Sequence, residues 1–305
     1  MLWIQWVSYI SVLIALIAML AKVLRYVRAP QNFRWELYPV PHEKGRAEYG
    51  GSYLEELDWW SKPRHSDLIN EVKEMLLEIL FLKGVYHHNK RVWLFSFPFH
   101  FGLYLCIGWL FLLFLGAVFQ AAGVTVTKDA GTIARLIYYL TVVSGYSGLV
   151  LTGYGALGLF IWRVSDSNQK AYNSFAEYFN LFFFVVVVAV SLIVHLGGDR
   201  DFAALRAYVQ SLLTLAPARP PTAFLSLEII LMSLLIMYIP LTRMSHFVAK
   251  YFLYHAVRWS DTPNERGSKI EKRIMELLQK KVSWNAAHIQ TGKSWAEVIK
   301  ENKNE

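Results

Sequence analysis

The sequence predicts an all-α membrane protein built as a bundle of five transmembrane helices. Hydrophobic residues make up 55% of its 305 residues, and the mean hydropathy is +0.30. Crossing a bilayer takes about 20 apolar residues. Five stretches are long enough to do so, at 2–23, 97–120, 133–162, 178–196 and 224–241. Apolar residues this abundant and this unevenly spread exclude a single soluble domain.

The basic residues predict which side of the membrane each loop faces. Of the 31 Lys and Arg residues, all but five lie in the loops on one side of the bundle or at its C-terminus; the exceptions are Lys128, Arg135, Arg200, Arg206 and Arg219. Positive charge gathers in cytoplasmic loops. We therefore expect a multi-pass protein of the cytoplasmic (inner) membrane, with its N-terminus outside and its C-terminus in the cytoplasm. The same asymmetry explains the net charge of +8 without nucleic acid.

These spans divide the chain into four parts. Residues 1–27 form the first helix, which we interpret as retained because no basic stretch precedes it and no small-residue cleavage pattern follows it. Residues 28–96 form a cytoplasmic loop, 97–250 the other four transmembrane helices, and 251–305 a cytoplasmic tail. Together they give a five-helix bundle with a long cytoplasmic loop and tail.

Three further segments carry a helical pattern without the length to span. Residues 68–83 place apolar side chains at helical spacing after a Ser66-Asp67 cap. This amphipathic helix is too polar to cross the bilayer, and it suits either the membrane surface or a soluble partner. Residues 202–215 in an outer loop and 269–282 in the tail are also predicted helices. In the tail we expect Trp284 and Trp295 to tuck against the tail itself.

Two composition features concern cofactors. The third span is rich in glycine (Gly145, Gly148, Gly153, Gly155 and Gly158), and small residues let a helix or a flat cofactor approach the backbone closely. Cys106 is the single cysteine, so this chain alone forms neither an internal disulfide nor an iron–sulfur site.

Three histidines fall inside or at the edge of spans, where an ionisable side chain is a functional hypothesis by default. Because successive spans run in opposite directions, His100 near the start of the second and His246 near the end of the fifth both lie on the cytoplasmic side. His195 ends the fourth span and is expected roughly 30 Å away, across the hydrocarbon core.

Two imidazoles at matched depth on facing helices are the axial ligands that one b-type haem needs. Either histidine alone is better interpreted as an interfacial residue that hydrogen-bonds backbone or lipid. For the matched pair His100 and His246 we favour the haem. Its propionates call for cations, and Arg91 and Arg243 are the first candidates, followed by Lys250 and Arg163.

The runs Phe99–Gly102 and Pro240–His246, set in five helices with an outside N-terminus, resemble a known family. They are similar to the cytochrome b membrane subunit of respiratory nitrate reductase, its gamma subunit. They are more similar to one-haem relatives attached to iron–sulfur proteins of the heterodisulfide-reductase type. The resemblance implies electron transfer between a quinone, which is either menaquinone or ubiquinone, and a cytoplasmic iron–sulfur partner. It leaves the direction of flow open.

The chain also departs from the nitrate reductase subunit. That subunit binds a second haem through two further histidines, and the corresponding positions here are Leu110 and Glu228. Both ligands of the outer haem are thus missing, so we expect one haem. The long cytoplasmic loop has no counterpart there, so the expected partner is not a nitrate reductase.

A quinone needs proton-handling groups, and the sequence offers two sets. One set, on the cytoplasmic side, comprises Lys90, Arg91 and His87; the other, at the outer face, comprises His195, Glu228 and Asp199. The distance from His100 to Glu228 spans most of an 18-residue helical rise, roughly 27 Å at 1.5 Å per residue. Electron transfer from the haem to an outer quinone site over that distance is unfavourable, so we favour the cytoplasmic set. His195 and Glu228 are then expected to form a structural, hydrogen-bonded pair.

Two rival functions remain at this point. The chain could be a cofactor-free membrane anchor, or a transporter component that uses His195 and Glu228 as a proton path. The sequence contains neither the repeated halves nor the paired broken helices typical of transporters.

Overall fold

The protein was analysed as a computed structural model that describes residues 2–29, 45–46, 49, 55–62, 67–255, 265–287 and 289–301. Within these residues the fold is all-helical and contains no strand, only two isolated β-bridges. Five helices are long and apolar enough to cross a membrane, which confirms the predicted multi-pass membrane protein.

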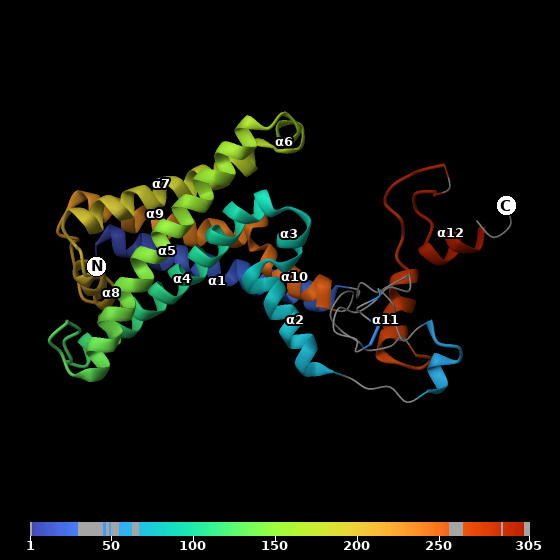
Figure 1. Cartoon of the computed structure of the whole chain (residues 1–305), viewed down its shortest axis with the longest axis horizontal. Helices are drawn as coiled ribbons and strands as arrows, with labels where there is room; N and C mark the ends of the chain where they lie inside the picture. The colour runs from blue at the N-terminus through green and yellow to red at the C-terminus, as the bar shows by residue number, and fades with distance from the viewer. Residues whose placement is uncertain are drawn as a thin grey trace. The chain divides into compact units, whose positions relative to one another are not determined.

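The five spans correspond closely to the predicted stretches. They are α1 (Trp3–Arg28), α4 (Lys90–Ala121), α5 (Thr132–Ser165), α7 (Phe175–Gly197) and α9 (Ala223–Leu241). Shorter helices connect or follow them: α2 (Leu68–Phe81), α3 (Lys83–His88), α6 (Ser167–Tyr172), α8 (Ala203–Thr214), α10 (His246–Tyr254), α11 (Lys269–Leu278) and α12 (Trp295–Glu301). Figure 1 shows their order along the chain.

The chain forms two compact units. Unit 1 comprises Met1–Ala18 and Leu77–Thr242, and unit 2 comprises Met19–Leu76 and Arg243–Glu305. Most of the membrane-spanning helices therefore belong to unit 1, whereas the turn after α9, the helix α10 and the C-terminal tail belong to unit 2.

Local sequence signals explain where several helices begin. The Asn89 side chain accepts a hydrogen bond from the backbone N–H of Val92 at the start of α4, and Thr222 does the same for Leu225 at the start of α9. Ser174 and Glu177 form a capping box at the start of α7. The predicted cap of α2 is present in Asp67, which accepts from Asn70, whereas Ser66 lies outside the described residues.

The second span begins earlier than predicted. α4 starts at Lys90 rather than at residue 97, and it continues through Pro98, which lies inside the helix. Proline removes one backbone hydrogen bond from a helix interior, which is why the sequence pattern suggested a later start. As a result His100 lies in the third turn of a longer helix, not in the first turn of a span.

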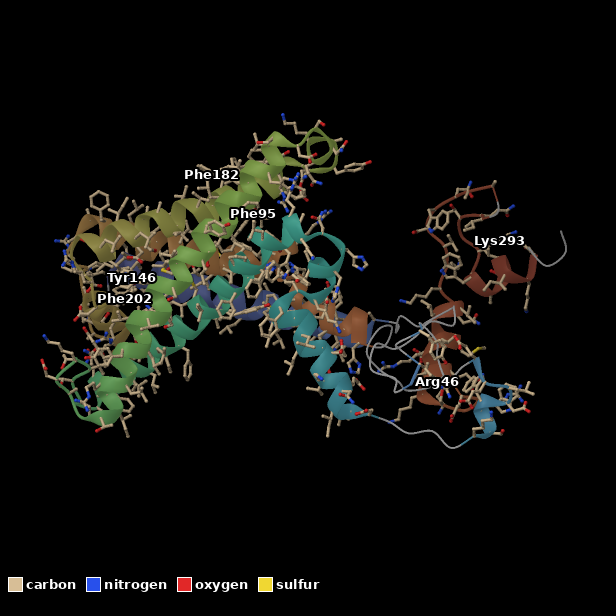
Figure 2. All side chains as sticks on the ribbon, in the orientation of Figure 1. Arg46, Phe95, Tyr146, Phe182, Phe202 and Lys293 are labelled. Atoms are coloured by element: carbon tan, nitrogen blue, oxygen red, sulfur yellow. The ribbon has the colours of Figure 1, made fainter. Side chains whose placement is uncertain are left out.

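Close approach of α4 and α5 organises unit 1, and Figure 1 shows the two helices side by side. A methyl group added at Gly155 would lie 2.5 Å from Phe99 Cβ, and one added at Gly158 would lie 2.1 Å from the Phe95 ring. Figure 2 labels Phe95 on the α4 side of this contact. Four of the five glycines on α5 thus face residues of α4, while Gly153 faces Val188 of α7.

The opposite surface of α4 is apolar and exposed. Ile107, Phe111 and Phe114 are 65%, 62% and 46% exposed, whereas Trp109 and Leu113 between them are buried. This division into a packed face and an apolar exposed face is what contact with lipid requires of a spanning helix. The structure therefore supports bilayer contact for α4 from its side-chain directions as well as from its composition.

The remaining predicted segments agree with the structure in part. The predicted helix 202–215 is present as α8, and the predicted helix 269–282 is present as α11 but ends at Leu278. Pro240 lies in the last turn of α9, and the chain leaves the helix one residue later. In the tail, Trp295 packs against a small core of Val282, Ile289 and Val298, and its ring lies edge to face with that of Trp284 at 6.3 Å.

Replacing Gly155 by Ala should destabilise the bundle, because the new methyl would also lie 2.6 Å from the Phe95 carbonyl oxygen. We expect a loss of about 1–3 kcal/mol, as for other overpacked cores. Gly108→Ala is the matched control on α4, since nothing lies within 4 Å of its added methyl. Unfolding of both variants in mixed micelles, followed by circular dichroism, measures the difference. Equal unfolding midpoints for the two variants would contradict the close contact of α4 and α5 at Gly155.

Candidate functional site

His100 is held by its own helix. Its Nδ1 lies 2.7 Å from the Ser96 carbonyl oxygen, one turn earlier on α4, and 3.4 Å from the Ser96 hydroxyl. A carbonyl oxygen only accepts, so Nδ1 of His100 carries a hydrogen. The ring is half-buried and packs edge to face against Phe99, whose backbone lies against Gly155.

His246 has a related arrangement in unit 2. It is the first residue of α10, and its Nδ1 lies 3.3 Å from the carbonyl oxygen of Arg243 in the preceding 3₁₀ turn, Arg243–Ser245. That contact again assigns a hydrogen to Nδ1. The turn is held from α1, because the Lys22 ammonium donates to the buried Ser245 hydroxyl.

His100 belongs to unit 1 and His246 to unit 2, so their pairing stays a prediction. The cationic candidates fall in the same two groups. Arg91 is on the first turn of α4, nine residues or about 14 Å of helical rise before His100. Arg243 lies in the 3₁₀ turn of unit 2. Both side chains are exposed.

The other predicted cytoplasmic-side residues gather where α3 meets α4. His87 is in the last turn of α3 and Lys90 is the first residue of α4; both are exposed. Tyr86 lies between them, with its ring edge to face with His87 at 5.6 Å and under the Lys90 ammonium at 5.4 Å. Such contacts leave both side chains accessible at the end of the bundle from which His100 is reached.

Two other predicted cations have structural partners. Arg163 Nη1 donates to the Glu177 carbonyl oxygen at 3.2 Å and so joins the end of α5 to the start of α7. Lys250 lies on α10 in unit 2. Neither is placed against His100 by the structure of unit 1.

His195 and Glu228 meet in the interior of unit 1. His195 Nε2 lies 3.0 Å from Glu228 Oε1, and both side chains are fully buried. His195 Nδ1 lies 3.0 Å from the Asp199 carbonyl oxygen and 3.5 Å from Asp199 Oδ2. The predicted hydrogen bond between His195 and Glu228 is thus confirmed. Because both ring nitrogens are engaged, His195 offers no lone pair to a metal.

Aromatic side chains enclose this pair. The His195 ring lies 4.2 Å from that of Phe202 and 6.1 Å from that of Trp109 on α4. Tyr146 of α5 donates to the backbone carbonyl oxygens of His195 and Arg200 and packs on Phe202. Figure 2 labels Tyr146 and Phe202 close together at this end of α5. We call these residues, with Asp199 and Glu228, the α8-end cluster.

The depth expected for His195 is wrong. Trp109 stands only nine residues after His100, so the level of His195 is about 14 Å from that of His100 along α4, half the predicted distance. The expected distance of roughly 27 Å between His100 and Glu228 is too long for the same reason, because Glu228 lies 3.0 Å from His195. Figure 1 shows the cause: α4 and α5 cross α7 and α9 at an angle, so positions along different helices do not correspond as in a parallel bundle.

Sequence reasoning missed several members of this cluster. Trp109 Nε1, Ser191 Oγ and Glu228 Oε2 are buried and have no hydrogen-bond partner among the described residues. Ser191 stands one helical turn before His195, and this i, i+4 spacing on α7 was visible in the sequence. The burial of Trp109 was not, because every residue around it in that span is apolar.

Asp199 joins the pair to α8. Its Oδ1 accepts from the Ala204 N–H at 2.8 Å and its Oδ2 from the Leu205 N–H at 3.1 Å, so it caps the helix. Burial raises the pKa of Asp199, but hydrogen bonds from His195 and these two amides outweigh burial and hold the pKa below its usual 3.8. Asp199 is therefore an anion at neutral pH.

No group of three or more His, Cys, Asp or Glu side chains that could hold a metal ion occurs in the described part of the chain. The chain also matches no protein-family model, no curated protein and no solved structure. The resemblance to nitrate reductase gamma subunits therefore stays a prediction that rests on the two histidine runs and the five spans.

Replacing Asp199 by Asn should destabilise α8 at neutral pH by about 1–2 kcal/mol, because bonds to a charged acceptor become bonds to a neutral one. The folded-state pKa lies below the unfolded one, so this stability is complete above pH 3.8 and disappears as the pH falls further. Melting temperatures of the two proteins should converge in acid. Asp129→Asn, at an exposed loop carboxylate, is the control; a pH-independent difference for Asp199→Asn would contradict the assignment.

Proposed function

We propose that this chain is a membrane b-type cytochrome subunit that transfers electrons between a membrane quinone and a cytoplasmic iron–sulfur protein. His100 and His246 are the proposed ligands of one haem. A haem held by two imidazoles carries one electron at a time and has no open coordination position. Bilayer-spanning helices supply the setting in which such a carrier meets a lipid-soluble quinone.

The observation that supports this proposal best is the hydrogen bond that each of the two histidines makes through Nδ1. In each ring Nδ1 donates to a backbone carbonyl oxygen nearby in sequence, at Ser96 for His100 and at Arg243 for His246. A second bond of this kind fixes the tautomer and orientation of metal-ligating histidines. His195 engages both of its ring nitrogens within the α8-end cluster.

The basic residues at the start of α4 take the proton-handling role in this proposal. Quinone reduction consumes two protons, and His87, Lys90 and Arg91 are exposed groups that can bind or position them. Arg91 and Arg243 are the proposed partners of the propionates. The cytoplasmic iron–sulfur partner, resembling heterodisulfide reductase, is proposed from the family resemblance and from the positive-inside orientation.

The hydrogen bond between His195 and Glu228 favours a second candidate, a proton-conducting component without haem. A buried histidine–carboxylate pair inside a spanning region is typical of proton relays. The two candidates differ in one simple property, since the second has no visible chromophore.

A reduced-minus-oxidised spectrum of the purified chain should show one b-type haem per polypeptide. His100→Ala and His246→Ala should each abolish that band, since each removes an axial ligand. His88→Ala, an exposed histidine beside the same helix, should retain it. A band that survives in either ligand variant would refute the assignment, and its absence from the unmodified protein would favour the haem-free candidate.

Thermal unfolding of the three variants separates loss of ligation from loss of fold. We expect His100→Ala and His246→Ala to keep a cooperative transition. A second haem in the unmodified protein would contradict the argument from Leu110 and Glu228.

A further inference from the structure

The α8-end cluster contains a buried carboxyl group that the proposed electron transfer does not use. Glu228 is fully buried on α9, and only one of its two oxygens has a protein partner, His195 Nε2 at 3.0 Å. A carboxylate buried in an apolar core with an oxygen that receives no hydrogen bond is costly. Protonation of that oxygen removes the carboxylate charge and leaves the His195 imidazolium facing the Asp199 carboxylate.

The hydrogen bonds around His195 determine where protons can reside. Nδ1 faces the Asp199 carbonyl oxygen, which only accepts, so Nδ1 carries a hydrogen in every state. The 3.0 Å contact between Nε2 and Glu228 Oε1 holds one more proton, on the ring or on the carboxyl. Either position leaves the pair with no net charge. A further proton can bind only at Glu228 Oε2, where no protein donor among the described residues competes.

We infer that His195 and Glu228 form a site for one exchangeable proton, bound at Glu228 Oε2. When the proton is bound, Oε1 accepts from the His195 Nε2–H and the Oε2–H becomes a donor inside the cluster. When it leaves, the carboxylate is balanced by the imidazolium. The reaction is a proton transfer alone, and it requires no electron and no other reactant.

The surroundings of the pair suit both states. The titratable and charged groups around it are Tyr146 from α5, Arg206 from α8, and Asp199, Arg200 and Asp201 from the loop between α7 and α8. Asp199 remains an anion and supports the imidazolium. Arg206 is buried and donates to the Val126 and Asp201 carbonyl oxygens, so its charge is fixed by backbone acceptors.

The cluster also has a route to solvent. The side chains of His195 and Glu228 are 0% exposed, whereas that of Asp199 is 10% exposed and contacts the His195 ring. Asp199 is thus the group through which the buried pair is nearest to solvent. Ser191, buried one turn before His195, adds a hydroxyl on the same face of α7.

Infrared difference spectra of the full chain in lipid nanodiscs, recorded against pH, test this inference. A protonated carboxylic acid has a carbonyl band that shifts in D₂O, and we expect a Glu228-dependent band that grows as the pH falls. Glu228→Gln should abolish it. Glu71→Gln, which removes another buried glutamate, should keep it.

His195→Gln is the second variant, because it keeps Glu228 but removes the imidazole that shares a proton with it. The pH midpoint of the Glu228 band should move; an unchanged midpoint would show that the carboxyl titrates without His195. Labelling glutamate with ¹³C in the unmodified protein shows whether the band comes from glutamic rather than aspartic acid, and Glu228→Gln then assigns it to Glu228. A labelled protein with no pH-dependent glutamic acid band would overturn the inference, whatever its haem content.

Discussion

The close contact between α4 and α5 determines the geometry of both sites in unit 1. Glycines on α5 let the side chains of α4 reach the α5 backbone at two levels. Gly155 admits Phe99, the neighbour of His100, and Gly145 admits Trp109, whose indole packs on His195. A larger residue at Gly155 would push α4 away, since its added methyl would lie under 3.0 Å from α4 backbone atoms; at Gly145 it would displace the rings of Trp109 and Phe202. One helix pair therefore positions a candidate ligand and a candidate proton site together.

His100 and His195, the two histidines on the spanning helices of unit 1, differ in where their rings are held. His100 Nδ1 contacts its own helix at the Ser96 carbonyl oxygen. His195 is held on both sides, by the loop before α8 and by α9. A ring engaged at both nitrogens cannot ligate a metal, but His195 Nε2 can share a proton with Glu228. The structure thus gives a physical reason to exclude His195 as a ligand, where the sequence offered only its depth.

The sequence predicted the spans well because the requirement is simple. A helix must satisfy its own backbone in lipid, and a run of about 20 apolar residues is unmistakable. It predicted relative depth poorly, because depth depends on how helices cross. The way α4 packs on α5 depends on glycine contacts such as Gly158 with Phe95, which no periodicity reveals.

Arg206 shows a second limit of prediction from sequence. A basic residue in an outer loop suggested exposure, yet its side chain is 1% exposed. Its guanidinium donates to two carbonyl oxygens, and its aliphatic stem lies against Gly116 of α4. Long cationic side chains can be buried when backbone acceptors at both ends of their reach are available. Those acceptors, Val126 and Asp201, become neighbours only after α8 has packed on α4.

The α8-end cluster also bears on the number of cofactors. In the family that the chain resembles, the positions of Leu110 and Glu228 hold the ligands of a second haem. Here Leu110 packs against an apolar core that includes Trp109 and Phe202, and Glu228 is bonded to His195. The side chains of Trp109, His195 and Phe202 are all 0% exposed and fill this level of the bundle. A cofactor of that size would have to displace several of them, and it would leave the buried His195 without its partner, a cost of several kcal/mol. This packing supports the proposal of one haem rather than two.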